Sequence, residues 1–208
     1  MKNTLLILFF MLNLSLCSGQ SKWKLFWKQT PPERCWAITH PFVAMKAWRI
    51  SVEVRKVSDS LVKAGFMDGD GNGGQLDAFR HSYWMARLCS VMKASKAYKL
   101  GKAHEKGNFL QYKKHQNEDG ALPDEAACSM DMWNNCMGIE IAKQYPQTTK
   151  DSLQLIVTQW ILAGKMKIIK KNKAGISLNI ENKPITNDTI PQPWQTERIL
   201  VPSNSARE

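Results

Sequence analysis

Three short stretches of the chain concentrate the side chains that do chemistry in proteins. They are Asp77–Trp84 (DAFRHSYW), Ala103–Glu105 (AHE) and Met130–Asn135 (MDMWNN), and they hold two of the four histidines. The surrounding sequence has the apolar periodicity of helices. Polar groups on the inner face of a helix are costly to bury unless they bond one another, a ligand or a metal. These stretches are therefore the first candidates for a functional site.

Two of the stretches repeat one helical spacing. In the first, the offsets i, i+3, i+4 and i+7 fall on Asp77, Arg80, His81 and Trp84. In the third, the same offsets fall on Asp131, Asn134, Asn135 and Gly138. A helix carries each set on one stripe, and glycine lets two backbones approach closely. We expect the two stripes to face each other across a groove, with His104 and Glu105 at its mouth.

One interpretation of this cluster is a hydrolase with a divalent metal such as zinc. The expected metal ligands are His81, His104 and Asp131, supported by Asn134 or Asn135. Glu105 or Asp77 would then act as the general base on a metal-bound water. Arg80 would bind an anionic group such as a phosphate through two of its nitrogens.

Two other interpretations need no metal. His81 with Asp77 or Glu105 would form a general acid–base pair, while Arg80 and the asparagines Asn134 and Asn135 stabilise a developing oxyanion. Alternatively, the same groups form a buried polar network that fixes how the helices pack. The protein would then be a non-catalytic exported binding or structural protein. The residues alone leave these alternatives open.

The glycine-rich loop before the first stretch resembles part of a calcium-binding loop. Asp68, Asp70 and Asn72 alternate with glycines, as in the first half of an EF-hand loop. The twelfth position of that pattern, which requires a glutamate, is Phe79. We therefore favour a helix–helix connection built from turn residues over a calcium site.

The first nineteen residues have the composition of an export signal. Lys2 gives a positive start, residues 5–14 form an apolar run too short to span a bilayer, and small residues end at Gly19. Residues 14–17 also resemble a lipoprotein box, which would place a lipidated Cys17 at the mature end. The expected location is the periplasm or the cell exterior, with the protein either released or anchored by lipid. No later segment has the sequence of a transmembrane helix.

The charge and the cysteines limit the partners and the covalent structure. The chain has a formal net charge of +11, which favours anionic substrates or surfaces such as lipid headgroups, nucleic acid or wall polymers, or serves solubility. The sequence does not decide the oligomeric state. Export permits disulfides among Cys35, Cys89, Cys128 and Cys136, or all four remain free thiols. If 128–136 is one helix, Cys128 and Cys136 lie about 12 Å apart and do not pair with each other.

The periodicity predicts a mainly α-helical fold, a compact bundle of about five helices with a short C-terminal β-hairpin. The expected helices span 41–64, 75–94, 95–105, 125–145 and 151–163, and the hairpin pairs 165–169 with 176–180. A basic aromatic strap at 20–40 precedes the helical domain at 41–170. Residues 171–208 form the hairpin remainder and an extended tail.

The three motifs, in this order, resemble a bacterial domain family of unknown function. The resemblance rests on DAFRHxYW, AHE and MDxxNNxxG and covers about residues 65–170. It is a family of exported proteins and of the ends of large toxin-like polypeptides. The resemblance implies a compact α-helical domain, and the toxin-like contexts favour an enzyme, but it brings no reaction. This chain has Met132-Trp133 where the family often has Leu-His, so it lacks a histidine that could serve as a ligand.

Overall fold

The structure, a computed structural model, describes residues 22–65, 67–117, 120–185 and 193–205. The export signal expected at 1–19 and the lipoprotein cysteine Cys17 lie outside the described residues. Seven helices and one small antiparallel sheet are described, so the mainly α-helical class is confirmed. The elements are α2 Lys22–Lys28, α3 Pro31–Thr39, α4 Pro41–Lys63, α5 Gln75–Cys89, α6 Ala94–Lys113, α7 Glu125–Gln144, α8 Lys150–Leu162, β1 Lys167–Ile169 and β2 Leu200–Pro202.

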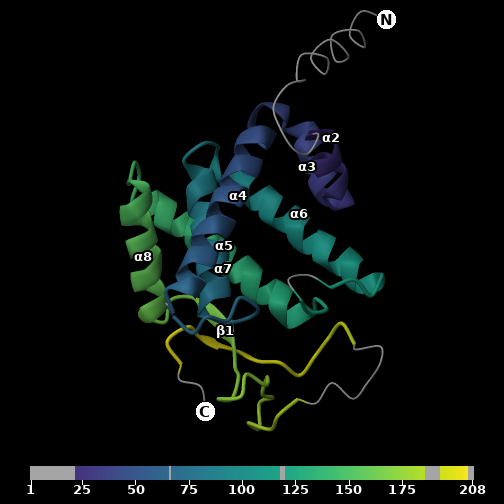
Figure 1. Ribbon diagram of the computed structural model, residues 1–208, viewed down its shortest axis with the longest axis vertical. Helices are drawn as coiled ribbons and strands as arrows, with labels where there is room; N and C mark the ends of the chain where they lie inside the picture. Colours follow the sequence, from purple (N-terminus) through teal and green to yellow (C-terminus); the bar gives the residue numbers. More distant parts are fainter. Residues whose placement is uncertain (1–21, 66, 118–119, 186–192, 206–208) are drawn as a thin grey trace, which may run out of the picture.

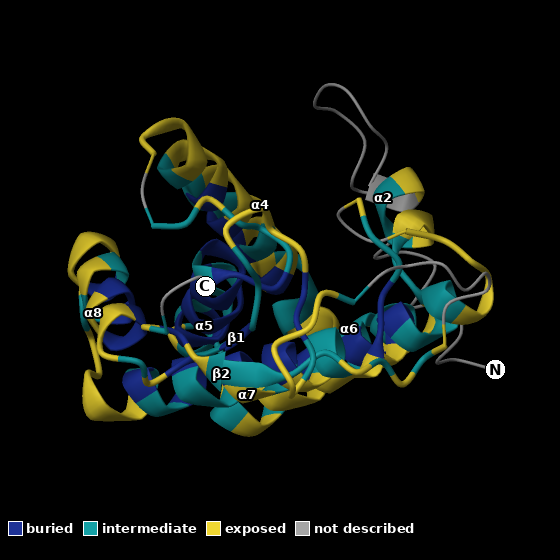
Figure 2. Cartoon of the chain, turned by 90° about the horizontal axis from the view of Figure 1, so that it is seen from below, coloured by how far each residue is buried: buried dark blue, intermediate teal, exposed yellow. Residues whose placement is uncertain are grey.

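Helix α5 is the centre of the molecule (Figure 1). It packs against α4, α6, α7, α8 and β1, and Figure 2 shows it mostly in the colour of buried residues. Its wholly enclosed side chains include Phe79, Tyr83, Met85 and Leu88. Burying each of these contributes on the order of 1.5–3 kcal/mol, so α5 anchors the core. Its polar stripe is held rigidly as a consequence.

Helices α5 and α7 approach each other very closely. A Cβ atom at Gly138 would collide with the backbone oxygen of Ser82, and one at Gly101 of α6 would lie 3.0 Å from Nδ2 of Asn135. The expectation that Gly138 permits close packing of the two polar stripes is confirmed. Glycine at 138 is required for this approach of α5 and α7, and Gly101 gives the Asn135 side chain room between α6 and α7.

The helix boundaries depart from the prediction at α5 and α6. Helix α5 ends at Cys89, five residues before the predicted end at 94. Directly after the observed end, the Oγ of Ser90 donates to the carbonyl of Arg87. Helix α6 continues through 106–108, where we expected an interruption. Gly107 leaves room for the side chain of Thr30, and Nδ2 of Asn108 donates to Glu105 at 3.1 Å. Packing against α3 thus outweighs the low helix propensity of glycine.

The predicted hairpin is wrong in its strand pairing. Strand β1 pairs antiparallel with β2 from the C-terminal tail, with Ile168 opposite Val201. Residues 172–175 do form a turn, and the segments beside it meet in an isolated bridge between Lys171 and Ser177 and a backbone hydrogen bond from Leu178 to Lys170, without forming strands. The tail is fixed because Oγ of the buried Ser203 donates to the carbonyl of Ile161 at 2.7 Å. Residues 200–202, which we expected in an extended tail, thus form a strand.

The segment expected as an aromatic strap forms the two short helices α2 and α3. Pro31 and Pro32 begin α3, where a proline needs no hydrogen-bond donor. Trp36 packs into the core, and its Nε1 donates to the carbonyl of Lys96, whereas Trp27 is half exposed. These helices account for the difference between five expected and seven observed helices.

Among the described residues, no helix combines the length and apolar character needed to cross a bilayer.

Candidate functional site

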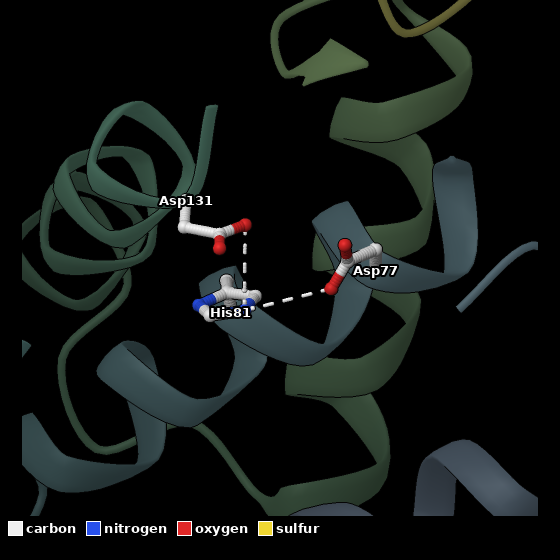
Figure 3. Close-up of side chains that lie close together, drawn as sticks. All are labelled: Asp77, His81 and Asp131. Atoms are coloured by element: carbon white, nitrogen blue, oxygen red, sulfur yellow. Dashed lines mark ion pairs between the residues drawn. The ribbon is translucent and has the colours of Figure 1, made fainter. Parts of the chain in front are cut away.

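The close contact of α5 and α7 brings three buried side chains together: Asp77, His81 and Asp131 (Figure 3). The Nε2 atom of His81 lies 3.5 Å from Oδ1 of Asp77 and 3.4 Å from Oδ1 of Asp131. The three atoms that could bind a cation all lie within 4.8 Å of one another. The helical spacing predicted from Asp77 and His81 is thus present, and α7 supplies the third member.

Asp77 is held from two sides. One carboxylate oxygen accepts from the backbone N–H of Gly73 at 2.7 Å, and the other accepts from Nη2 of Arg80 at 2.7 Å. Asp77 also lies in the first turn of α5, where the helix dipole favours negative charge. These contacts fix its Oδ1 atom toward His81.

The environment of His81 favours the neutral imidazole. Burial, followed by the nearby positive charges of Arg80, His104 and Arg55, holds the pKa of His81 well below its usual 6.5. The side chain of Asn135 lies near enough to oppose this effect weakly. Neither Nδ1 of His81 nor the amide atoms of Asn135 has a hydrogen bond of normal geometry to another described residue. A neutral imidazole is the form that binds metals.

Two hollows border this group of three. The smaller, of about 30 Å³, is lined in part by Asp77, Arg80, His81, Asn108 and Asp131. The larger, of about 590 Å³, lies among α2, α3, α4, α5 and α6 and is mostly apolar. Arg80 and His81 line both hollows. A substrate group that reacts at Asp77, His81 and Asp131 (the triad) would therefore lie next to the larger hollow, which could hold the rest of the substrate.

His104 forms a separate pair on the wall of the larger hollow. Its Nδ1 lies 3.0 Å from Oε1 of Glu33, and its ring centroid is 6.1 Å from that of His81. The other oxygen of Glu33 accepts from the backbone N–H and the hydroxyl of Thr30. Burial works to raise the pKa of Glu33, but the hydrogen bonds from His104 and Thr30 outweigh it and lower that pKa overall. His104 was expected as a metal ligand beside His81 and Asp131, and the structure places Asp77 there instead.

The sequence profile of a family described as a domain of unknown function, DUF6973, matches residues 34–165. The chain belongs to the DUF6973 family. The match takes in α4 to α8, and with them Asp77, His81, His104 and Asp131, whereas Glu33 stands one residue before it. No curated protein and no solved structure matches the chain significantly.

Glu33 lies at this site, although the sequence analysis did not propose it. The run Thr30-Pro-Pro-Glu33 has the pattern of a capping box, and the structure has that box at the start of α3. A capping box predicts a helix start and nothing more. That the second carboxylate oxygen reaches His104, 71 residues away, is a consequence of α3 packing on α6.

Three other predicted site residues of the DUF6973 domain make different contacts. The buried Glu105 accepts from Asn108, and it lines neither of the two hollows described above. Asn134 donates to the carbonyl of Lys167 and accepts from its N–H, both at 3.0 Å. This pair fastens β1 to α7. Asn135 lies between His81 and Gly101, and so stays at the site.

The glycine-rich loop of the DUF6973 domain uses its acidic groups internally. Asp68 accepts from the backbone of Asp70, Gln75 and Leu76, and so caps the start of α5. The ammonium of Lys171 lies 2.6 Å from both Oδ2 of Asp70 and the carbonyl of Asn72. A lysine therefore supplies the positive charge at the place where a calcium ion would have to bind. These contacts are those of an ordered connection between α4 and α5.

The four cysteines of the described residues are free thiols, so of the two alternatives the disulfides are not formed. Cys128 and Cys136 both lie on α7, as the helical prediction required. Cys35 is exposed on α3, whereas burial raises the pKa of the Cys89 thiol to about 11. Chemistry by thiolate at Cys89 is therefore disfavoured at neutral pH.

Proposed function

We propose that this DUF6973 protein is an exported, metal-dependent hydrolase of a phosphate-containing anionic substrate. Asp77, His81 and Asp131 would hold the metal. The observation that carries the proposal is the position of His81 Nε2, at 3.5 and 3.4 Å from one oxygen of each carboxylate. The proposal revises the ligand set expected from the sequence by exchanging His104 for Asp77.

The spacing of these atoms suits ligands of a common ion better than hydrogen bonds. N–H···O bonds are about 2.7–3.2 Å long, and a single N–H cannot serve two carboxylates equally. Two ligands that each lie about 2.0–2.2 Å from a tetrahedral ion stand about 3.3–3.6 Å apart. Both distances from His81 Nε2 fall in that second range.

The set of donor atoms also fits catalysis. One imidazole and two carboxylates suit zinc or a harder divalent ion such as manganese, and three protein ligands leave a position open for substrate or water. The adjoining hollow of about 30 Å³ has room for about one water molecule. A metal bound here would lower the pKa of bound water and polarise a phosphoryl oxygen.

Arg80 and His104 would act on the substrate itself. Arg80 donates to Asp77 through one nitrogen and lines both hollows, and its guanidinium is the group that suits a phosphate oxygen best. The hydrogen bond between Nδ1 of His104 and the carboxylate of Glu33 orients the imidazole ring, and His104 lines the larger hollow, where it would transfer a proton to a leaving group. His104 thus takes the acid–base role that the sequence had offered to Glu105.

Export is part of the proposal and rests on residues 1–19. A positive start, a short apolar run and a small-residue end are the parts of a signal sequence. The basic chain, at +11, would be attracted to anionic material outside the cytoplasm.

A second function has its own support. Asp77 bonds the loop at Gly73, so part of the cluster performs a structural task. In the alternative, the cluster is a polar network of a non-catalytic binding protein. The two functions differ in whether loss of Asp131 removes a chemical activity or only stability.

Elemental analysis joined to an activity assay tests the proposal. We expect about one zinc or manganese per chain and metal-dependent hydrolysis of bis(p-nitrophenyl) phosphate or p-nitrophenyl phosphate. Asp131→Asn should lose both metal and activity while remaining folded, and Asp151→Asn on the exposed start of α8 should keep both. A metal-free wild type that is insensitive to added metal, with an Asp131→Asn variant that merely melts earlier, would favour the network instead.

A further inference from the structure

We infer that the hollow of about 590 Å³ binds a single-chain amphiphile with a phosphate head, with the hydrocarbon chain among α2, α3 and α4 and the head beside Arg80 and His104. This inference rests on the proposed hydrolase, because it names the class of substrate for the same site. It concerns binding, however, and can be measured without turnover.

The lining of the hollow suits a hydrocarbon chain. Five helices contribute apolar side chains to it, among them Leu25, Phe26, Trp36, Val52, Trp84 and Leu100. Its volume lies within the range of about 300–1,000 Å³ that is usual for small-molecule sites, which are mostly apolar with a few polar groups that fix orientation. An apolar hollow of this size that opens to water favours an apolar occupant.

The charged residues of the hollow suit an anionic head. Arg55 and Arg80 line it near the neutral His81, so positive charge lies on the side where the hollow meets Asp77, His81 and Asp131. Lys56 and Asp59, of opposite charge, also line the hollow. The acidic Glu33 on the same wall is already hydrogen bonded to His104 and Thr30. A phosphate that accepts from Arg80 would stand next to Asp77 and His81, since Arg80 contacts Asp77 at 2.7 Å.

The combination favours an amphiphile over the other anionic partners. Nucleic-acid sites present aromatic and basic groups along an open, basic groove. Here the aromatic residues Trp36 and Trp84 lie inside a hollow, next to aliphatic neighbours. An inorganic phosphate would use only the charged side and leave the apolar side without a partner.

Calorimetric titration of the full chain with dodecyl phosphate, below its micelle concentration and in the presence of a chelator, tests the inference. We expect saturable 1:1 binding, weaker by roughly fourfold for each methylene removed in the decyl and octyl compounds. Dodecyltrimethylammonium lacks the anionic head and inorganic phosphate lacks the hydrocarbon chain, so each should bind at least about tenfold more weakly than dodecyl phosphate.

Paired variants on α4 supply the controls. Val52→Asp in the hollow should weaken dodecyl phosphate at least about tenfold, whereas Val62→Asp, as exposed on the same helix but outside the hollow, should not. Arg55→Gln should reduce the preference for dodecyl phosphate over dodecyltrimethylammonium. Arg49 does not line the hollow, so Arg49→Gln should leave that preference unchanged. All variants keep the same N-terminal residues, so any binding of dodecyl phosphate to those residues contributes equally to each measurement and does not affect the comparison.

Equal weakening by the two valine variants, or equal affinity for the cationic amphiphile, would overturn the inference. So would a dimer that Val52→Asp dissociates, because the hollow would then cover a second copy. If dodecyl phosphate does not bind but the protein holds metal and hydrolyses phosphoesters, the substrate class fails and the hydrolase stands. If dodecyl phosphate binds as expected but the protein takes up no metal, the binding site stands and the hydrolase fails.

Discussion

His81 on α5 and Asp131 on α7 lie 3.4 Å apart, measured from imidazole Nε2 to carboxylate Oδ1, although fifty residues separate them in sequence. Both side chains are buried, and Asp77 approaches the same nitrogen from one turn earlier on α5. The site therefore depends on the helix–helix contact as much as on the residues themselves.

Removal of metal should lower the stability of the wild-type protein. A ligand that binds only the folded state adds about 2.7 kcal/mol at a concentration 100 times its Kd. We expect zinc or manganese to raise the Tm in differential scanning calorimetry and a chelator to reverse the rise. In Asp131→Asn the Tm should be the same with and without metal. An equal metal-induced rise in that variant would place the bound ion elsewhere.

Gly138→Ala should separate α5 from α7. The new Cβ would meet the Ser82 carbonyl, which is backbone and has little freedom to move, so we expect a loss of about 1–3 kcal/mol in the free energy of unfolding. Metal affinity should fall with it, because His81 and Asp131 move apart. Gly71→Ala is the control, since the nearest neighbour of its Cβ would be Leu76 at 3.8 Å. Urea denaturation that gave equal stabilities for the two variants would contradict the close packing.

Glu33→Gln should change the response of stability to acid. The folded-state pKa of Glu33 is lowered by its bonds to His104 and Thr30, relative to an ordinary value of 4.5. Its ionised form therefore adds stability above pH 4.5, and that stability is lost as the pH falls through the lower folded-state value. The difference in unfolding free energy between wild type and Glu33→Gln should therefore shrink as the pH falls below 4.5. A difference that grows on acidification would reverse the assignment.

The thiols should differ widely in reactivity. Cys35 is exposed, whereas burial raises the pKa of Cys89 to about 11, which leaves little thiolate at pH 8. We expect a disulfide reagent such as DTNB to label Cys35 within the mixing phase and Cys89 only after unfolding. Cys35→Ser should remove the fast phase. A persistent fast phase in that variant would show that another thiol is accessible.

The local parts of this fold could be predicted and the long-range parts could not. The stripes on α5 and α7 follow from spacing alone, because Asp77 and His81 are one helical turn apart on any helix. Asp124 and Thr149 cap α7 and α8 through side-chain oxygens, a local role typical of aspartate and threonine. The β1–β2 pairing and the Glu33–His104 contact join distant segments, and no local pattern in either partner specifies the other. The interruption expected at Gly107 failed for the same reason, since only the packed Thr30 explains the glycine.

The most direct test of the central claim is anomalous diffraction from crystals grown with zinc or manganese. The account predicts one peak about 2.0–2.2 Å from Nε2 of His81 and from a carboxylate oxygen of each of Asp77 and Asp131. It also predicts that the peak disappears in Asp131→Asn. A peak at His104 and Glu33 or at the loop of Asp68 and Asp70, or the lack of any peak in a metal-loaded crystal, would contradict it.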